Sequence, residues 1–214
     1  MKTELEKRKR IASVFCNVLA VVLTAVSVAG FYTVGGRGNM HVGGSLCFRY
    51  FTVDSNILAA AASVPVLAFA VRGKKLPQWA LIAKFIAATA VGVTFFTVMF
   101  FLGPIMGYRA MFVGNNFFMH GVTPILSMLS FSLFEHGTPL TKKQALLGVL
   151  PTAVYATVYL VMVVLRGAEN GGWPDFYGFN RGGMWPISFG IMLLATAGLG
   201  QLLRLANRAG EKCR

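Results

Sequence analysis

Long stretches without a charged side chain divide this sequence. Its 20 Lys and Arg and 7 Asp and Glu are spaced so that six uncharged runs remain, at residues 11–36, 55–71, 85–108, 110–134, 144–165 and 182–203. A helix rises about 1.5 Å per residue, so about 20 residues cross the roughly 30 Å hydrocarbon core of a bilayer. Each run is near that length, and 56% of the chain is hydrophobic. The charge spacing therefore predicts an all-α, polytopic membrane protein and excludes a disordered chain.

We expect a single domain, residues 1–214, built as a bundle of six transmembrane helices. The helices are predicted at about 11–34, 49–71, 79–102, 115–135, 144–165 and 183–205. The loops between them are short, and no repeat of 20 to 50 residues is visible. The first apolar run is too long for the core of a cleavable signal peptide, so we expect the first helix to stay in the mature protein.

The positive charges indicate the orientation of this bundle. Of the 20 Lys and Arg, 14 fall on the side of the termini, five fall on the opposite side, and Lys84 lies inside the third predicted helix. The positive-inside rule then predicts that both termini are cytoplasmic. The net charge of +13 is interpreted as a topology signal with some attraction to anionic lipid, and not as a nucleic-acid-binding surface.

Polar side chains lie near the outer ends of the second and fourth predicted helices. They are spaced three or four residues apart, so each set shares one helical face. The two faces are Thr52, Ser55 and Asn56 on one helix, and Asn116, His120 and Thr123 on the other. Thr52 and His120 would lie roughly 5 and 7 Å below their helix starts at about 1.5 Å per residue. We therefore expect the threonine and the histidine to meet.

Each polar residue also has a structural interpretation. Thr52 can bond back to a carbonyl one turn earlier, and His120 and the two asparagines can be hydrogen-bond partners between helices. Asp54 points away from Thr52 and is expected to stabilise its own helix by interacting with the dipole. Pro124 cannot donate to the carbonyl of His120, so a kink is expected there. The matching depth of the polar residues favours a functional site.

Metal and cofactor sites are not predicted. The three histidines, His41, His120 and His136, lack the spacing of a metal site, and no paired carboxylates accompany them. A retinal-type Schiff base on Lys84 is disfavoured because six helices are one short of that architecture. We expect Lys84 to reach toward the cytoplasmic interface instead.

The stretch RGAENGGWPDFYGFNRGGMWP, residues 166–186, is the longest predicted outer loop. Its aromatic residues are typical of a belt at the level of the lipid headgroups. In the alternative interpretation the loop is a lid over the polar pocket, with Asp175, Asn180 and Arg181 lining the mouth.

The segments RYFTVDSNILAA and FFMHGVTPIL resemble the Pr6Pr family of bacterial membrane proteins. That family has a Tyr-Phe-Thr-x-x-Ser-Asn pattern in its second helix and a His shortly before a Pro in its fourth. It is similar to the androgen-induced and androgen-dependent six-helix proteins of animals, which hydrolyse fatty acid esters of hydroxy fatty acids (FAHFAs). The resemblance implies a bacterial inner-membrane hydrolase acting on a lipid ester, with Thr52 as nucleophile and His120 as general base. The segment that follows Thr52 departs from the animal pattern.

The implied chemistry needs a base and an oxyanion donor. A neutral imidazole can take the proton of a threonine hydroxyl, and an acyl-threonine ester then forms. Asn56 and Asn116 are the best oxyanion candidates, followed by Ser55 and then Thr123. The alternative is a non-enzymatic membrane protein that binds or transports a lipid or small polar solute in the same pocket.

Overall fold

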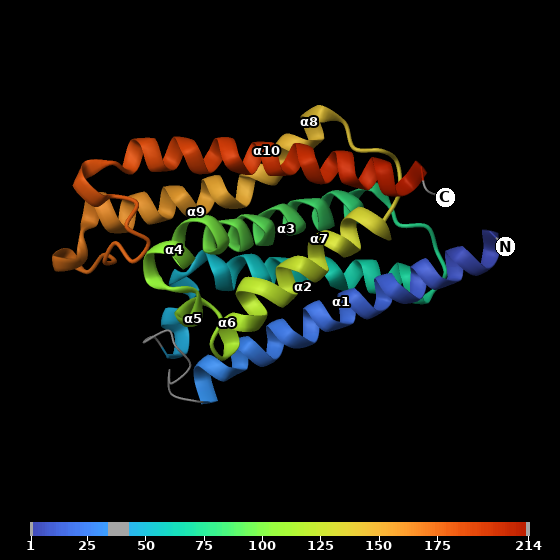
Figure 1. Cartoon of the computed structure of the whole chain (residues 1–214), viewed down its shortest axis with the longest axis horizontal. Coiled ribbons are helices and arrows are strands. Elements are labelled where there is room, and N and C mark those ends of the chain that lie inside the picture. The colour runs from blue at the N-terminus through green and yellow to red at the C-terminus, as the bar shows by residue number, and fades with distance from the viewer. Residues whose placement is uncertain (1, 34–42, 213–214) are drawn as a thin grey trace.

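The computed structural model describes residues 2–33 and 43–212, and this part of the chain is 84% helical with no strand. Its long helices lie side by side in a bundle (Figure 1). The start of α1 and the end of α10 lie at one end of the bundle, which we call the termini end. Helices α4, α5 and α6 and the link between α9 and α10 lie at the opposite end, the loop end.

Five helical stretches in the described residues are long and apolar enough to cross a membrane. They contain α1 (Lys2–Thr33), α2 (Phe51–Val71), α3 (Gln78–Thr97) with its continuation to Met106, the segment Lys142–Arg166, and α10 (Trp185–Lys212). The continuation of α3 is a π-helical turn (Val98–Leu102) followed by α4 (Gly103–Met106). The segment Lys142–Arg166 contains α8 (Lys142–Ala145), a 3₁₀ turn (Leu146–Val149), α9 (Leu150–Leu160) and a π-helical turn (Val161–Arg166). Helices α1 and α10 run further into their charged ends than the sequence predicts.

The fourth predicted helix is present but divided. A short helix, α5 (Tyr108–Met111), precedes it, and the predicted segment itself consists of α6 (Asn115–Phe117), a π-helical turn (Phe118–Val122) and α7 (Thr123–Leu133). Pro124 stands at the start of α7, where it lacks the N–H that a regular helix would donate to His120. The π-helical turn surrounds His120, which agrees with the expected distortion at this residue.

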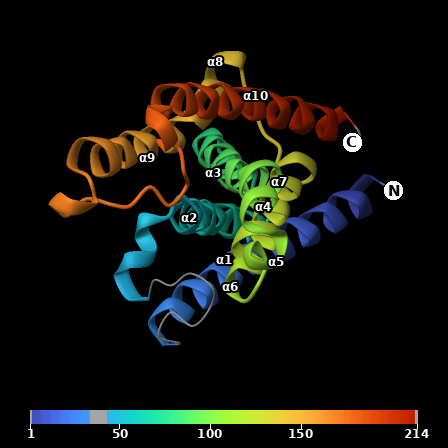
Figure 2. The same ribbon diagram turned by 60° about the vertical axis from the view of Figure 1, so that its left-hand side comes forward.

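Helix α3 is the centre of the bundle, where it packs against α2, α7 and α10 (Figure 2). Toward the termini end, the rings of Phe85 and Phe131 lie 5.5 Å apart, centroid to centroid, in a cluster with Leu81 and Leu140. Small residues allow helices to approach closely in such bundles. A β-carbon at Gly148, for example, would lie 3.0 Å from the side chain of Thr89.

Helix α1 has the reverse of a soluble amphipathic pattern. Its exposed residues include the apolar Phe15, Val22 and Val26. Its buried face, which packs against α2 and α7, holds polar side chains at Ser13, Asn17, Thr24 and Ser27. Exposed apolar and buried polar residues are expected where lipid is the solvent, so this pattern supports the membrane assignment.

Candidate active site

The structure brings Thr52 and His120 together. The Oγ1 atom of Thr52 lies 3.3 Å from Nε2 of His120, and both residues are buried. Thr52 is in the first turn of α2, and His120 is in the π-helical turn that leads into α7. No other hydrogen bond of the Thr52 hydroxyl is seen among the described residues. The expected contact is therefore present, and the hydroxyl does not bond back along its own helix.

The other ring nitrogen of His120 identifies its tautomer. Nδ1 lies 2.6 Å from the backbone carbonyl oxygen of Met111. A carbonyl can only accept, so Nδ1 must carry the hydrogen, and in a neutral imidazole Nε2 then has a free lone pair. That lone pair faces the Thr52 hydroxyl. The carbonyl of Met111 orients the ring of His120.

Two glycines shape the chain that brings Met111 to the histidine. Gly107 has φ +88° where it precedes α5, and Gly114 has φ +61° where it precedes α6. These positive φ angles are readily adopted only by glycine. They allow the chain to reverse twice within a few residues, so the last residue of α5 lies beside the π-helical turn.

The side-chain amide of Asn56 already donates both of its hydrogens. Its Nδ2 donates to the carbonyl of Thr52 at 2.7 Å and to the carbonyl of Met119 at 3.0 Å. An amide nitrogen has two hydrogens, so neither remains for an oxyanion. The amide instead joins α2 to the π-helical turn and supports the positions of Thr52 and His120.

Ser55 contacts Thr94, a residue that was not predicted from the sequence. Its Oγ donates to the Thr52 carbonyl at 3.1 Å and lies 2.9 Å from Oγ1 of Thr94 on α3. Because the single hydrogen of Ser55 is donated to the Thr52 carbonyl, Thr94 is the donor in its bond with Ser55. Thr94 also lines the cavity described below. The signal for Thr94 in the sequence was a hydroxyl side chain within the third uncharged run, residues 85–108.

Asn116 and Thr123 are buried, like His120. The Oδ1 atom of Asn116 and the hydroxyl of Thr123 are buried, and no hydrogen-bond partner is seen for them in the described chain. Thr123 begins α7 one turn beyond His120. In the described chain, neither residue has a hydrogen bond that would place it as a donor at the Thr52 hydroxyl.

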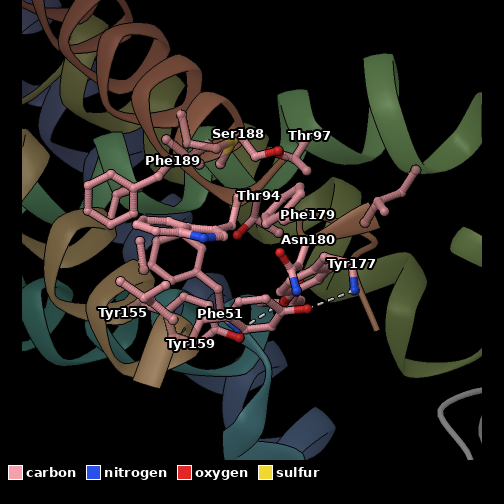
Figure 3. A pocket seen from close by; sticks show the side chains of 18 of the residues that line it. Phe51, Thr94, Thr97, Tyr155, Tyr159, Tyr177, Phe179, Asn180, Ser188 and Phe189 are labelled. Carbon is pink, nitrogen blue, oxygen red and sulfur yellow. Dashed lines mark hydrogen bonds between the residues drawn. The ribbon is translucent and has the colours of Figure 1, made fainter. Parts of the chain in front are cut away.

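A cavity of about 60 Å³ opens beside Thr52, between α2, α3, α9 and α10. Figure 3 shows side chains from these helices and from the loop between α9 and α10 surrounding a common space. The walls are mainly apolar and aromatic, with a few hydroxyl and amide groups; they include Phe51, Thr94, Thr97, Val98, Thr152, Tyr155, Tyr159, Tyr177, Phe179, Asn180, Trp185, Phe189 and Met192. We call this space the aromatic cavity. An apolar pocket with few polar groups is typical of a site for a lipid-like ligand.

The loop between α9 and α10 closes one side of this cavity. The Tyr177 hydroxyl accepts a hydrogen bond from the backbone N–H of Phe51 at 3.0 Å, at the first residue of α2. Burial raises the pKa of Tyr177 above its ordinary value, so the phenol stays neutral. The ring of Phe176 lies 4.6 Å from that of Tyr50, centroid to centroid. The loop therefore packs onto the bundle over the start of α2, as expected for a lid.

The three predicted mouth residues have different positions. Asn180 lines the aromatic cavity, and its Oδ1 atom is buried with no partner seen in the described residues. Asp175 does not line the cavity: its carboxylate accepts from the Tyr159 hydroxyl at 2.8 Å and from the backbone N–H groups of Phe179 and Asn180. Arg181 is exposed. Asp175 therefore shapes the loop, and only Asn180 reaches the cavity.

The expectation for Lys84 is wrong. Its side chain is completely buried, and its Nζ donates to Oδ1 of Asn17 at 2.8 Å and to Oγ of Ser63 at 2.9 Å. Asn17 in turn donates to Oε1 of Glu135 at 2.5 Å. The lysine points into the bundle because these polar groups on α1, α2 and the end of α7 offer hydrogen bonds there.

The described residues contain no group of three His, Cys, Asp or Glu side chains that could hold a metal ion. His41 and Cys213 lie outside the described residues, and Cys16 and Cys47 are buried free thiols. No protein-family model, curated protein or solved structure matches the chain.

Proposed function

We propose that this chain is a membrane-embedded threonine hydrolase that cleaves a lipid ester, such as a fatty acid ester of a hydroxy fatty acid, as its resemblance to the Pr6Pr and androgen-induced proteins implies. The observation that carries the proposal is the hydrogen-bonded series from Met111 through His120 to Thr52. It gives a hydroxyl, a lone pair aimed at it, and a third group that orients the base. The distance of 3.3 Å is slightly longer than the hydrogen bond expected during catalysis. Such bonds are commonly longer in the absence of substrate.

In the proposed reaction, Oγ1 of Thr52 attacks the ester carbonyl while Nε2 of His120 takes the hydroxyl proton. The tetrahedral intermediate collapses, the ester C–O bond breaks, and His120 gives the proton to the departing alkoxide. Water then attacks the acyl ester while His120 takes its proton. The bond between the acyl carbon and Oγ1 of Thr52 breaks, His120 returns the proton to Oγ1, and the fatty acid leaves. No cofactor is needed for either step.

We assign Thr94, in place of Asn56, as the donor to the oxyanion. Asn56 has no free N–H, whereas the Thr94 hydroxyl lines the same cavity as Thr52 and is held by Ser55. The Thr94 hydroxyl can rotate its hydrogen from Ser55 toward the substrate oxygen as charge develops there.

We also propose how the protein is oriented in the membrane. The divided segment 115–133 acts as a sixth span, both termini are cytoplasmic, and the protein lies in the inner membrane of a bacterium. The charge asymmetry supports this orientation. The loop end then faces outward, and the aromatic cavity opens toward the outer leaflet.

Hydrolysis by the purified protein in lipid nanodiscs tests the proposal. Release of free fatty acid from a panel of long-chain esters is compared among the wild type, Thr52→Ala and Thr157→Val. Thr157 is an exposed threonine whose hydroxyl bonds back to Ala153 at 2.8 Å, so its variant controls for loss of a structural hydroxyl. We expect turnover by the wild type and Thr157→Val but not by Thr52→Ala. Turnover that survives in Thr52→Ala contradicts the assignment.

The binding alternative has its own observation. Thr152 Oγ1 and Asn180 Oδ1 both belong to residues that line the aromatic cavity, and both are buried with no partner seen in the described chain. They are suited to bind a polar group on a lipid without any reaction. Under this alternative no ester in the panel is cleaved by any variant, and Thr52→Ala only weakens retention of a lipid.

A further inference from the structure

The bundle contains a second polar cluster, deeper than the Thr52 and His120 pair and toward the termini end. We call it the Lys–Glu layer. Its centre is Lys84, bonded to Asn17 and Ser63, and Asn17 connects the lysine to the carboxylate of Glu135. Ser130 also donates to Oε1 of Glu135. A completely buried lysine with a buried carboxylate is costly inside a membrane bundle and marks a functional site by default.

The two polar sites lie at equivalent positions along two helices. On α2, Ser63 follows Thr52 by eleven residues, and on the segment that ends in α7, Ser130 follows His120 by ten. At about 1.5 Å per residue, each interval is roughly 15 Å. The Lys–Glu layer thus lies about half a bilayer below the Thr52 and His120 pair.

A row of buried polar side chains connects the two sites. The row follows the π-helical turn and α7. Its residues are spaced three or four apart, so they face the same side of the helix: His120, Thr123, Ser127 and Ser130. Neighbours at this spacing have β-carbons about 5–6 Å apart. That separation is one that a single water molecule bridges between two hydroxyls.

Polar groups in the middle of this row lack hydrogen-bond partners among the described residues. The hydroxyls of Thr123 and Ser127 and the Oδ1 atom of Asn56 are buried, and none has a hydrogen-bond partner among the described residues. Buried polar atoms are normally paired with protein or ordered water. Across the row, α1 contributes the hydroxyl of Thr24, whose Oγ1 lies 3.5 Å from the carbonyl of Asn56. These groups are polar sites between the Thr52 and His120 pair and the Lys–Glu layer.

The Lys–Glu layer borders solvent at the termini end. A hollow of about 930 Å³ there is lined by Ser13 and Glu135 at its inner wall and by charged residues from α1 and the α2 to α3 connection, including Lys9, Arg10, Lys74 and Lys75. Oε2 of Glu135 is buried and no partner for it is seen in the described chain. Within the bundle, Asn17 on α1 connects Glu135 to Lys84 on α3.

We propose that this polar row is a proton path that joins the Thr52 and His120 pair to the hollow at the termini end through Thr123, Ser127, Ser130 and Glu135. A proton accepted at one end is passed by successive hops, each breaking one O–H or N–H bond as it forms the next. Rotation of each hydroxyl restores the row, so the path consumes no other reactant. The inference goes beyond ester hydrolysis, because proton movement along the row does not require Thr52 to react.

Proton flux into proteoliposomes tests the path. Vesicles containing the purified protein and an internal pH-sensitive dye are given a potassium diffusion potential with valinomycin, and the initial rate of pH change is recorded. We expect the wild type to exceed protein-free vesicles several-fold. Glu135→Gln, which removes the proton-accepting carboxylate, and Thr123→Val, which keeps the shape but removes the hydroxyl, are expected to reduce the rate to that of protein-free vesicles.

One control makes the result specific. Thr196→Val makes the same change at a buried threonine of α10 whose hydroxyl bonds to the Met192 carbonyl at 2.6 Å, outside the row, and is expected to conduct like the wild type. A wild-type rate equal to that of protein-free vesicles overturns the path, as does a Thr123→Val rate equal to that of Thr196→Val. If Glu135→Gln does not fold, the comparison of the two valine variants decides.

Discussion

The Nδ1 atom of His120 lies 2.6 Å from the carbonyl oxygen of Met111. Since this bond fixes the hydrogen on Nδ1, it leaves Nε2 to accept from Thr52. The contact with Met111 thus connects a short helix at the loop end to the base that the proposed hydrolysis needs.

Replacing the base should remove most of the activity. We expect His120→Ala to lower the rate of ester hydrolysis by about 10²–10⁴, because general-base catalysis contributes that factor. Added imidazole should restore part of the rate by occupying the space left by the ring. Initial rates with and without imidazole check this, and a His120→Ala protein with wild-type turnover rules out the histidine as the base.

Thr94→Val tests the assigned oxyanion donor. Valine keeps the shape of threonine but cannot donate, so kcat is expected to fall by about 10²–10³ while KM changes little. Thr97→Val, at another hydroxyl on the cavity wall, is the matched control and should change kcat much less. Equal losses in both variants would assign Thr94 to binding and not to stabilisation of the intermediate.

The lid should depend on one tyrosine hydroxyl. Tyr177→Phe removes the acceptor for the Phe51 N–H, and an unsatisfied buried N–H costs about 1–3 kcal/mol. We expect a lower thermal midpoint and faster hydrogen exchange at the start of α2. Tyr32→Phe, at an exposed tyrosine of α1, should leave both unchanged. Unaltered exchange in Tyr177→Phe would mean that the loop does not hold the helix start.

The buried lysine should be coupled to the buried glutamate. Lys84→Met removes the cation that Asn17 connects to Glu135, and we expect a loss of stability because a buried carboxylate without a compensating charge is costly. The double variant Lys84→Met with Glu135→Gln should recover part of this loss. Unfolding of all four proteins in detergent measures the interaction energy, and strictly additive losses would show that the two side chains are independent.

Much of the helical architecture followed from charge spacing and hydropathy, since a helix in lipid must be apolar over about 20 residues. The division of the segment around His120 was only partly predictable. Pro124 indicated a distortion, but its form, a π-helical turn, depends on packing with α1 and α2. The segment's polar residues also make it the least obvious span by composition.

The contact of Thr52 with His120 was predictable because helical spacing and depth both come from sequence position. The bond from His120 to Met111 was not, because a backbone carbonyl leaves no side-chain signal. The use of both Asn56 hydrogens likewise depends on the neighbouring helix. The sequence did contain a signal for the burial of Lys84. Polar residues recur at helical spacing on α1 and indicate a polar interior: Ser13, Asn17, Thr24 and Ser27.

Locating a covalent adduct is the most direct test of the hydrolase assignment. The wild-type protein in nanodiscs is treated with a lipid-like fluorophosphonate, digested, and examined by peptide mass spectrometry. The proposed mechanism predicts one adduct, on the Oγ1 atom of Thr52, which disappears in Thr52→Ala and is greatly reduced in His120→Ala. An adduct on a different residue, or no adduct in a folded protein, would contradict a threonine nucleophile at this position.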